Sequence, residues 1–209
     1  MKQTEKTSIC NKKPVALFSP LDWGLGHTTR SIPIITELLS NHCSVIVACN
    51  SMQKAVLEAE FPQVSFVGLE GYNLKYGKNR LYTYLLLALQ LPKILIKINK
   101  EKFWISRFLQ ENRVNLVISD NRFGFFSPKT PSVFITHQLA IQTGLGKWID
   151  QIAQRVNYRW IKKFTECWVP DFEDGPNAAG ILSHPPKLPP LPVRYIGCLS
   201  RFSDKNKKE

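Results

Sequence analysis

Short runs of β-forming residues alternate with helical stretches from Val15 onward. This alternation is typical of chains that build parallel sheets from β-α-β units. Most of the runs are continuously apolar, as expected for strands that helices cover on both faces. We therefore predict an α/β fold with a Rossmann-like, doubly wound, mostly parallel sheet. The expected strands are Val15–Ser19, Ser44–Cys49, Val64–Leu69, Asn115–Ser119, Ser132–Thr136, Glu166–Val169 and Val193–Ile196.

Four helices are expected between these strands. They are Thr28–Ser40, Ser51–Glu60, Arg80–Asn112 with a break near Pro92, and Leu145–Phe164. Hydroxyl side chains commonly cap helix N-termini, so Thr28 or Thr29 is expected to cap the first helix and Ser51 the second.

At 209 residues the chain has room for one substantial domain with short appendages. We expect a polar tail over residues 1–13, one domain over 14–202 and a polar tail over 203–209. Within the domain, proline-rich residues 170–192 are predicted to form an extended connector that leads into the last strand.

The charge of the chain favours an anionic partner. Lys and Arg number 28 and Asp and Glu 16, which gives a net charge of +12. Nucleic acid, an acidic membrane surface and a phosphorylated substrate all remain open on this ground.

The five cysteines are scattered without a C-x-x-C pair or a histidine at ligand spacing, so neither a disulfide framework nor a metal site is indicated. A reducing, cytoplasmic location follows as the expectation.

The loop after the first predicted strand, Ser19–Arg30, carries the clearest chemical signal. Gly24 and Gly26 would let a ligand approach the backbone closely at the N-terminus of a helix, where free N–H groups attract anions. His27 adds a group that can move a proton near neutral pH. Thr29 breaks the dinucleotide fingerprint, and no P-loop is present. A tight turn in which the histidine only packs or caps is the alternative.

Polar residues also follow two later strands, where Asp120, Asn121 and Arg122 come after one and His137 and Gln138 after the other. In a parallel sheet these loops converge on one crevice with the loop that carries His27. An aspartate beside a histidine orients the imidazole and makes it a better general base. The alternatives are an N-cap role for Asp120 and a strand-closing role for His137.

Three segments carry a family resemblance, namely Gly24–His27, Phe123–Pro128 and His137–Leu145. Their order and spacing over Pro14–Phe202 resemble the N-terminal half of GT-B-fold glycosyltransferases. The chain is most similar to the family of the N-acetylglucosaminyltransferase that makes peptidoglycan lipid II and of the galactolipid synthases. Asp22 and Trp23 depart from the small residues usual there.

The resemblance implies transfer of a sugar from a nucleotide sugar, with a UDP-sugar as donor, to a hydroxyl of a sugar or lipid-linked acceptor. His27 would be the catalytic base and Asp120 the residue that orients it. No bound cofactor and no metal are implied. The residues expected to bind the acceptor are Gly24, Gly26, Thr28, Asn121, Arg122, His137 and Gln138.

In such enzymes a second domain holds the donor, and we expect that domain to be absent from this chain and supplied by a further domain or a partner subunit. A non-catalytic acceptor-binding or anchoring subunit, a truncated remnant and a nucleotide-sugar epimerase remain as alternatives.

Apolar and basic residues are interleaved over Arg80–Asn112, a composition suited to the surface of an anionic bilayer. A core helix with a solvated lysine face is the alternative. We expect a cytoplasmic protein that is peripheral on the inner face of the membrane. Nucleic acid is not expected, because no RNP, KH or helix-turn-helix signature accompanies the aromatic residues.

Overall fold

The computed structural model describes residues 13–74, 77–78, 80–174 and 178–200. The tails predicted at 1–13 and 203–209 therefore lie outside the described residues, apart from Lys13. The strands are β1 (Val15–Pro20), β2 (Ser44–Cys49), β3 (Ser65–Gly68), β4 (Leu116–Asp120), β5 (Ser132–Ile135), β6 (Glu166–Val169) and β7 (Val193–Tyr195). The helices are α1 (Leu25–Ser40), α2 (Ser51–Glu60), α3 (Arg80–Glu111), α4 (Lys147–Ile161) and the 3₁₀ turn η1 (Gly180–Leu182).

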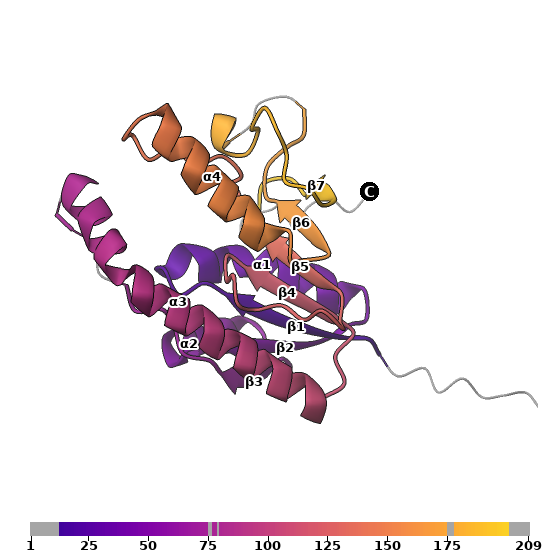
Figure 1. The fold of residues 1–209 in the computed structure, drawn as a ribbon. Helices are drawn as coiled ribbons and strands as arrows, with labels where there is room; N and C mark the ends of the chain where they lie inside the picture. The colour runs from indigo at the N-terminus through magenta and orange to yellow at the C-terminus, as the bar shows by residue number, and fades with distance from the viewer. Residues whose placement is uncertain (1–12, 75–76, 79, 175–177, 201–209) are drawn as a thin grey trace, which may run out of the picture.

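The seven strands form one sheet in the order β3-β2-β1-β4-β5-β6-β7, and each neighbouring pair is parallel. The order reverses direction between β1 and β4, which lie side by side in the middle of the sheet (Figure 1). The α/β class and the Rossmann-like parallel sheet predicted from the sequence are confirmed. A doubly wound sheet of this kind binds ligands beside the carboxyl ends of the strands at this switch point.

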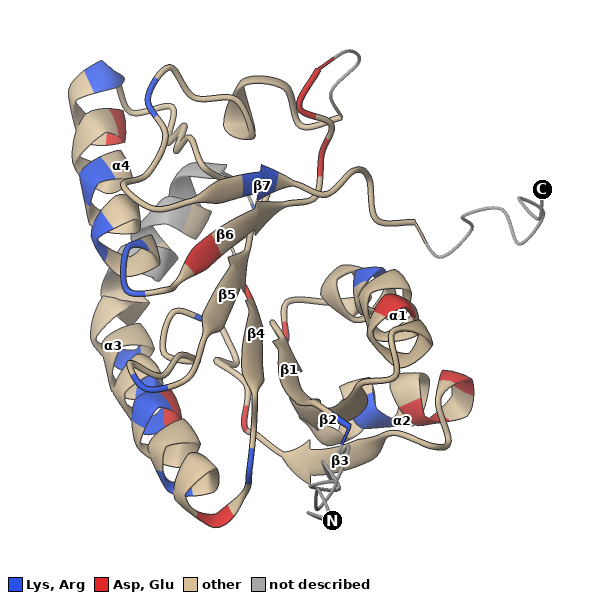
Figure 2. Ribbon diagram, turned by 90° about the vertical axis from the view of Figure 1, so that its right-hand side faces the viewer, with Lys and Arg blue, Asp and Glu red and all other residues tan. Residues whose placement is uncertain are grey.

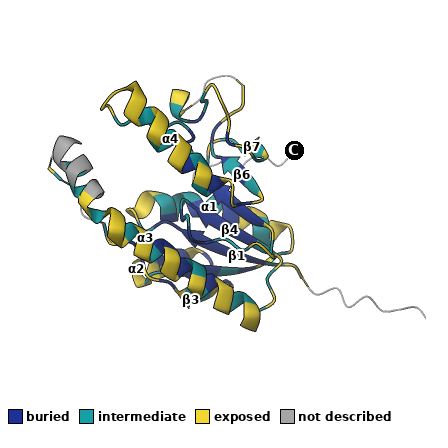
Figure 3. Cartoon of the chain, viewed as in Figure 1, coloured by how far each residue is buried: buried dark blue, intermediate teal, exposed yellow. Residues whose placement is uncertain are grey.

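Helices cover both faces of the sheet. Two views at right angles show α1 and α2 on one face and α3 and α4 on the other (Figures 1 and 2). Ile34 and Ile35 of α1 and Leu57 of α2 form a buried core with β1, β2 and β4, while Ile105 of α3 and Ile161 of α4 help to fill the opposite face. The central strands β1, β4 and β5 are accordingly the most buried elements, and the outer helix surfaces are the most exposed (Figure 3).

The structure corrects three local predictions. Helix α3 runs without a break through Pro92, because Ile94 and Ile98, which follow the proline, pack into a core with Leu21 and Tyr72. Separately from these corrections, no helix among the described residues has both the length and the apolar character needed to cross a bilayer.

The two N-caps also differ from the sequence predictions. Asn50, rather than Ser51, caps α2 through a capping box with Gln53. Helix α1 begins at Leu25, earlier than expected, and its N-cap residue Gly24 has no side chain to bond the first turn. The prediction of Thr28 or Thr29 as cap was wrong because the helix starts in the exposed glycine turn, before the apolar periodicity becomes visible.

Asp171 fixes the start of the proline-rich segment between β6 and β7. Its buried carboxylate accepts hydrogen bonds from Ser183 Oγ at 2.6 Å and from the backbone N–H groups of Phe172, Ala178 and Ala179. Burial opposes ionisation of this carboxyl, but these donors outweigh it and lower the pKa of Asp171 to about 2. One charged side chain thus ties the end of β6 to the turn at η1.

Candidate active site at the carboxyl edge of the sheet

Three predicted site residues meet where β1, β4 and β5 end. Asp120 is the last residue of β4 and lies in register with Pro20 of β1 and Ile135 of β5. His27 reaches it from the first turn of α1, so that its Nδ1 lies 2.8 Å from Asp120 Oδ2. The side chain of His27 is 15% exposed and that of Asp120 is 1% exposed. The imidazole therefore borders solvent while its carboxylate partner is shielded from it.

Arg30 joins this pair and was not assigned a role from the sequence. Its Nε lies 3.2 Å from Asp120 Oδ2 and its Nη2 lies 2.5 Å from Asp120 Oδ1, a bidentate ion pair. The i, i+3 spacing from His27 places both side chains on one face of α1. That spacing was the sequence signal that could have identified Arg30.

His137, the second residue after β5, also reaches the cluster. Its Nδ1 lies 3.1 Å from Nη1 of Arg30. Burial, together with the nearby Arg30 and His27, lowers the pKa of His137, while Asp120 and Asp171 act in the opposite direction. His137 is therefore biased toward the neutral form at this edge.

The N-terminus of α1 is open beside these side chains. Gly24, with φ of 70°, and Gly26 are both exposed, and a Cβ built on either meets nothing within 4 Å. The first turn contains no acidic residue and no side-chain cap. Its N–H groups and the positive end of the helix dipole are thus available to a ligand, next to His27.

Two other predicted residues line the same edge. Asn121 follows Asp120 in a left-handed conformation with φ of 57°, and its backbone N–H bonds to the carbonyl of Ile135. Gln138 is exposed, and its backbone carbonyl accepts a hydrogen bond from Asn157 of α4. Both positions are fixed through the backbone, with Asn121 half-buried and Gln138 exposed.

Two predicted residues do not reach this edge with their side chains. Arg122 is fully buried, and its guanidinium pairs with Glu101 of α3 and donates to the carbonyl of Glu70. Thr28 is also fully buried, and within the described part of the chain its hydroxyl oxygen has no hydrogen-bond partner. Arg122 turns inward because a buried carboxylate on α3 neutralises it, which the sequence spacing did not reveal.

Asp22 fastens the glycine loop to the chain after β3. Its carboxylate accepts the backbone N–H groups of Tyr72 at 3.0 Å and Asn73 at 3.3 Å. Gly71 permits this approach, since a Cβ there would lie 1.9 Å from Asp22 Oδ2. A hollow of about 370 Å³ lies between the two loops, lined by Asp22, Trp23, Gly24, Asn73 and Leu74. The residue that departs from the family pattern therefore shapes a pocket at the start of α1.

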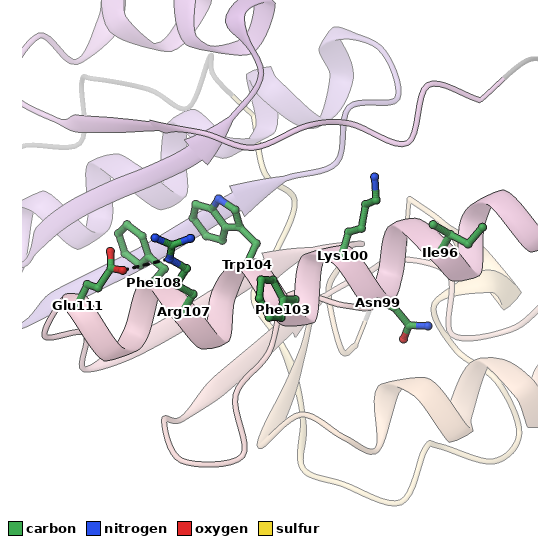
Figure 4. Close-up of a pocket in the computed structure, with 8 residues that line it drawn as sticks. All are labelled: Ile96, Asn99, Lys100, Phe103, Trp104, Arg107, Phe108 and Glu111. Atoms are coloured by element: carbon green, nitrogen blue, oxygen red, sulfur yellow. Dashed lines mark hydrogen bonds and ion pairs between the residues drawn. The ribbon is translucent and has the colours of Figure 1, made fainter.

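A larger groove of about 720 Å³ runs along α3 and contains none of the predicted site residues (Figure 4). Its lining combines exposed Phe103 with Lys100 and with an ion pair between Arg107 and Glu111. All of its lining residues belong to one helix. This groove is thus a feature of the helix surface, whereas the convergent polar groups lie at the carboxyl edge.

No protein-family model matches the chain, and no curated protein matches it. Solved structures do match. UGT2 of Phytolacca americana, complexed with UDP-2-fluoro-glucose and pterostilbene, has a TM-score of 0.54 at 18% identity over 92% of this chain and 56% of that chain. UGT89C1 of Arabidopsis thaliana gives 0.58 at 13% identity over 92% and 52%.

A UDP-glucosyltransferase of Polygonum tinctorium, in a complex with 3,4-dichloroaniline, gives a TM-score of 0.53 at 13% identity over 93% of this chain and 54% of that chain. The chain thus spans about half the length of these proteins. At such identities the likeness is one of fold. The chain therefore has the Rossmann-like α/β architecture found in GT-B glycosyltransferases.

Proposed function

We propose that this chain carries the acceptor side of a glycosyl transfer from a nucleotide sugar, a UDP-sugar, to a hydroxyl group. The observation that carries the proposal is the 2.8 Å contact between His27 Nδ1 and Asp120 Oδ2 at the switch point of the sheet. Its support is the chemistry of the pair combined with a fold that UDP-glucosyltransferases share.

In the proposed reaction His27 is the general base. With its Nδ1–H donated to Asp120, the imidazole has a lone pair at Nε2 for the proton of an acceptor hydroxyl. The hydroxyl oxygen then forms a bond to the anomeric carbon of the donor sugar while the bond from that carbon to the phosphate oxygen breaks. The nucleoside diphosphate leaves with the bonding electrons, and the proton stays on His27, whose positive charge Asp120 stabilises.

The acceptor would lie over the start of α1. Gly24 and Gly26 leave the space for it, the uncapped N–H groups favour oxygen atoms or negative charge, and Asn121, His137 and Gln138 border the same edge. We propose that the nucleotide is held by a part of the enzyme outside the described residues, in a second domain or a partner subunit.

A lipid-linked acceptor is the form we favour, because apolar and basic side chains share the outward surface of α4. Trp148 is 74% exposed, and Ile152 and Val156 follow it at helical spacing. Arg155 and Arg159 are exposed on the same helix, whose surface carries several basic residues (Figure 2). Such a surface suits an anionic bilayer, and we propose that the protein binds the cytoplasmic face of a membrane peripherally.

Helix α3 contributes to the same membrane surface. Leu89, Leu91 and Leu95 are 69%, 55% and 49% exposed. Helices α3 and α4 both extend beyond the carboxyl ends of the strands on one side of the molecule (Figure 1). Binding there would bring the headgroup of a lipid-linked acceptor toward His27.

The test is a turnover assay on the tagged chain, isolated from its native cells together with any protein that binds it. Labelled UDP-sugars and a total lipid extract are supplied, and release of UDP and labelling of lipid are measured. We expect turnover to fall by about 10²–10⁴ in His27→Ala. His42→Asn is the matched control, because His42 is exposed at the opposite end of α1.

Turnover by His27→Ala close to that of the unaltered chain would overturn the catalytic assignment. Lipid binding and partner capture that persist in that case would identify the non-catalytic subunit instead. No His27-dependent UDP release with any sugar nucleotide would overturn the proposed glycosyl transfer.

A further inference from the structure

The guanidinium of Arg30 stands between two histidines and one aspartate. Nη1 lies 3.1 Å from His137 Nδ1, and Nη2 lies 2.7 Å from His27 Nδ1 and 2.5 Å from Asp120 Oδ1. An arginine side chain has donors only and keeps its proton in proteins. Each histidine nitrogen that bonds to it must therefore act as an acceptor.

This requirement fixes the state of His137. To accept from Arg30, its Nδ1 must carry a lone pair, so the ring is neutral and its single proton sits on Nε2. The groups that face this ring are Arg30 and His27 from α1, Asp120 from β4 and Asp171 after β6. Burial and the first two oppose a positive charge on His137, and the two carboxylates favour it. The geometry and the surroundings agree on a neutral ring with an N–H donor at Nε2.

The same guanidinium creates a conflict at His27. Its Nδ1 lies 2.8 Å from Asp120 Oδ2, which needs a proton there, and 2.7 Å from Arg30 Nη2, which needs a lone pair there. One ring nitrogen has one in-plane position for either. His27 therefore donates to Asp120 with Nε2 free to act as a base, or accepts from Arg30 with Nε2 already protonated.

We propose that Arg30 is a positioning residue that sets the protons of both histidines, holding His137 as a neutral Nε2–H donor toward an oxygen of the acceptor and competing with Asp120 for Nδ1 of His27. The part that concerns the acceptor rests on the proposed function, whereas the proton positions are properties of this chain alone. Arg30 would thus keep His27 partly in a resting form and give the site a fixed donor.

The test is nitrogen NMR of the full 209-residue chain, labelled with ¹⁵N, in which long-range imidazole spectra separate protonated from unprotonated ring nitrogens. Signals are assigned with His27→Asn and His137→Asn. In the unaltered chain at neutral pH we expect unprotonated Nδ1 and protonated Nε2 at His137. At His27 we expect the averaged signals of two tautomers.

Arg30→Met should raise the titration midpoint of His137, because a positive neighbour and an Nδ1 donor are lost, and should leave Nδ1 of His27 protonated throughout. Arg30→Lys keeps the charge and should hold the midpoint of His137 closer to that of the unaltered chain. A proton on Nδ1 of His137 in the unaltered chain, or unchanged histidine spectra in Arg30→Met, would overturn the proposal.

Backbone amide spectra show whether each variant is folded, and Arg30→Lys carries the comparison if Arg30→Met is not. In the turnover assay, Arg30→Met should shift the pH profile of turnover and raise KM for the acceptor. Arg30→Lys should bring KM part of the way back to that of the unaltered chain. Spectra that follow these expectations without any His27-dependent turnover would refute the glycosyl transfer and leave the role of Arg30 in proton placement intact.

Discussion

Nδ1 of His27 lies 2.8 Å from Oδ2 of Asp120, although 93 residues separate the two in the chain. The contact joins the first turn of α1 to the end of β4, two elements whose positions the parallel sheet fixes. Because the side chain of Asp120 is 1% exposed, its charge acts on the imidazole with little screening by water. We therefore expect the two residues to act as one catalytic unit, so that replacing either one lowers turnover by a similar factor.

Asp120→Asn tests whether His27 and Asp120 act as one unit. Asparagine keeps the shape of the side chain but removes the charge and can present an N–H to His27, which favours the tautomer with a proton on Nε2. We expect turnover to fall by about 10²–10⁴, and the double variant with His27→Ala to be no worse than His27→Ala alone. The measurement is UDP release. Losses that multiply in the double variant would show that the two residues act independently.

Gly26→Ala separates ligand contact from folding. A Cβ at this position meets nothing within 4 Å, and alanine favours helix over glycine, so stability should rise by up to about 1 kcal/mol. The added methyl group would nevertheless occupy the space in which we place the acceptor. We expect KM for the acceptor to rise although the melting temperature does not fall. Normal kinetics in a folded Gly26→Ala variant would remove this residue from the site.

The sequence predicted the architecture well because the apolar runs are long and their order is that of a parallel sheet. Besides the helix break at Pro92 and the two N-caps, its errors concern side-chain direction. Arg122 lies two residues after Asp120 and was placed in the crevice, yet it turns inward to Glu101, a partner 21 residues earlier on helix α3. Arg30, which does reach the crevice, had only helical spacing to indicate it. Spacing along one chain predicts which backbone edges meet but not which buried carboxylate will attract an arginine.

The buried pair of Arg122 and Glu101 supports the β4 end of the site. Nη2 of Arg122 lies 2.7 Å from Oε1 of Glu101, and Oε2 of Glu101 accepts a hydrogen bond from Tyr72 Oη at 2.7 Å. The backbone N–H of Arg122 donates to Oγ of Ser119, the residue before Asp120. Glu101→Gln leaves a buried guanidinium without a counter-charge. We expect a loss of about 3–5 kcal/mol in the free energy of unfolding, measured by urea denaturation.

Glu111→Gln is the control for this loss. It removes a carboxylate from the same helix, but its ion pair with Arg107 is exposed, so the change should stay within about 0.5 kcal/mol. Equal effects of the two substitutions would contradict a structural role for the buried pair.

Asp171 predicts how stability depends on pH. Its carboxyl has a pKa of about 2 in the folded chain against 3.8 as the reference value. Because the folded value is the lower one, this stabilisation is fully present above about pH 4 and is lost as pH falls toward about 2. The difference amounts to about 2 kcal/mol. The melting temperature should therefore fall steeply between about pH 4 and about pH 2. In Asp171→Asn this fall should be smaller.

The matched control for Asp171 is Asp174→Asn, three residues further on and exposed. Its melts should follow those of the unaltered chain at every pH. An acid transition that Asp171→Asn leaves unchanged would assign the pH dependence to other carboxylates.

Binding to anionic vesicles tests the outward surfaces of α3 and α4. Trp148 and Ile152 are 74% and 40% exposed on a helix that also presents Arg155 and Arg159. We expect the chain to sediment with vesicles that contain phosphatidylglycerol and less with pure phosphatidylcholine, and we expect binding to the anionic vesicles to fall as salt rises. Trp148→Ser should weaken binding about tenfold or more, since a buried large apolar side chain contributes about 1.5–3 kcal/mol.

Met52→Ser is the control for this loss. Met52 is also apolar and is 69% exposed, but it lies on α2 across the sheet, so Met52→Ser should bind vesicles like the unaltered chain. If both substitutions weaken binding alike, attraction to the vesicle is not localised on α4, and if neither vesicle binds the chain, the lipid-linked acceptor loses its main support.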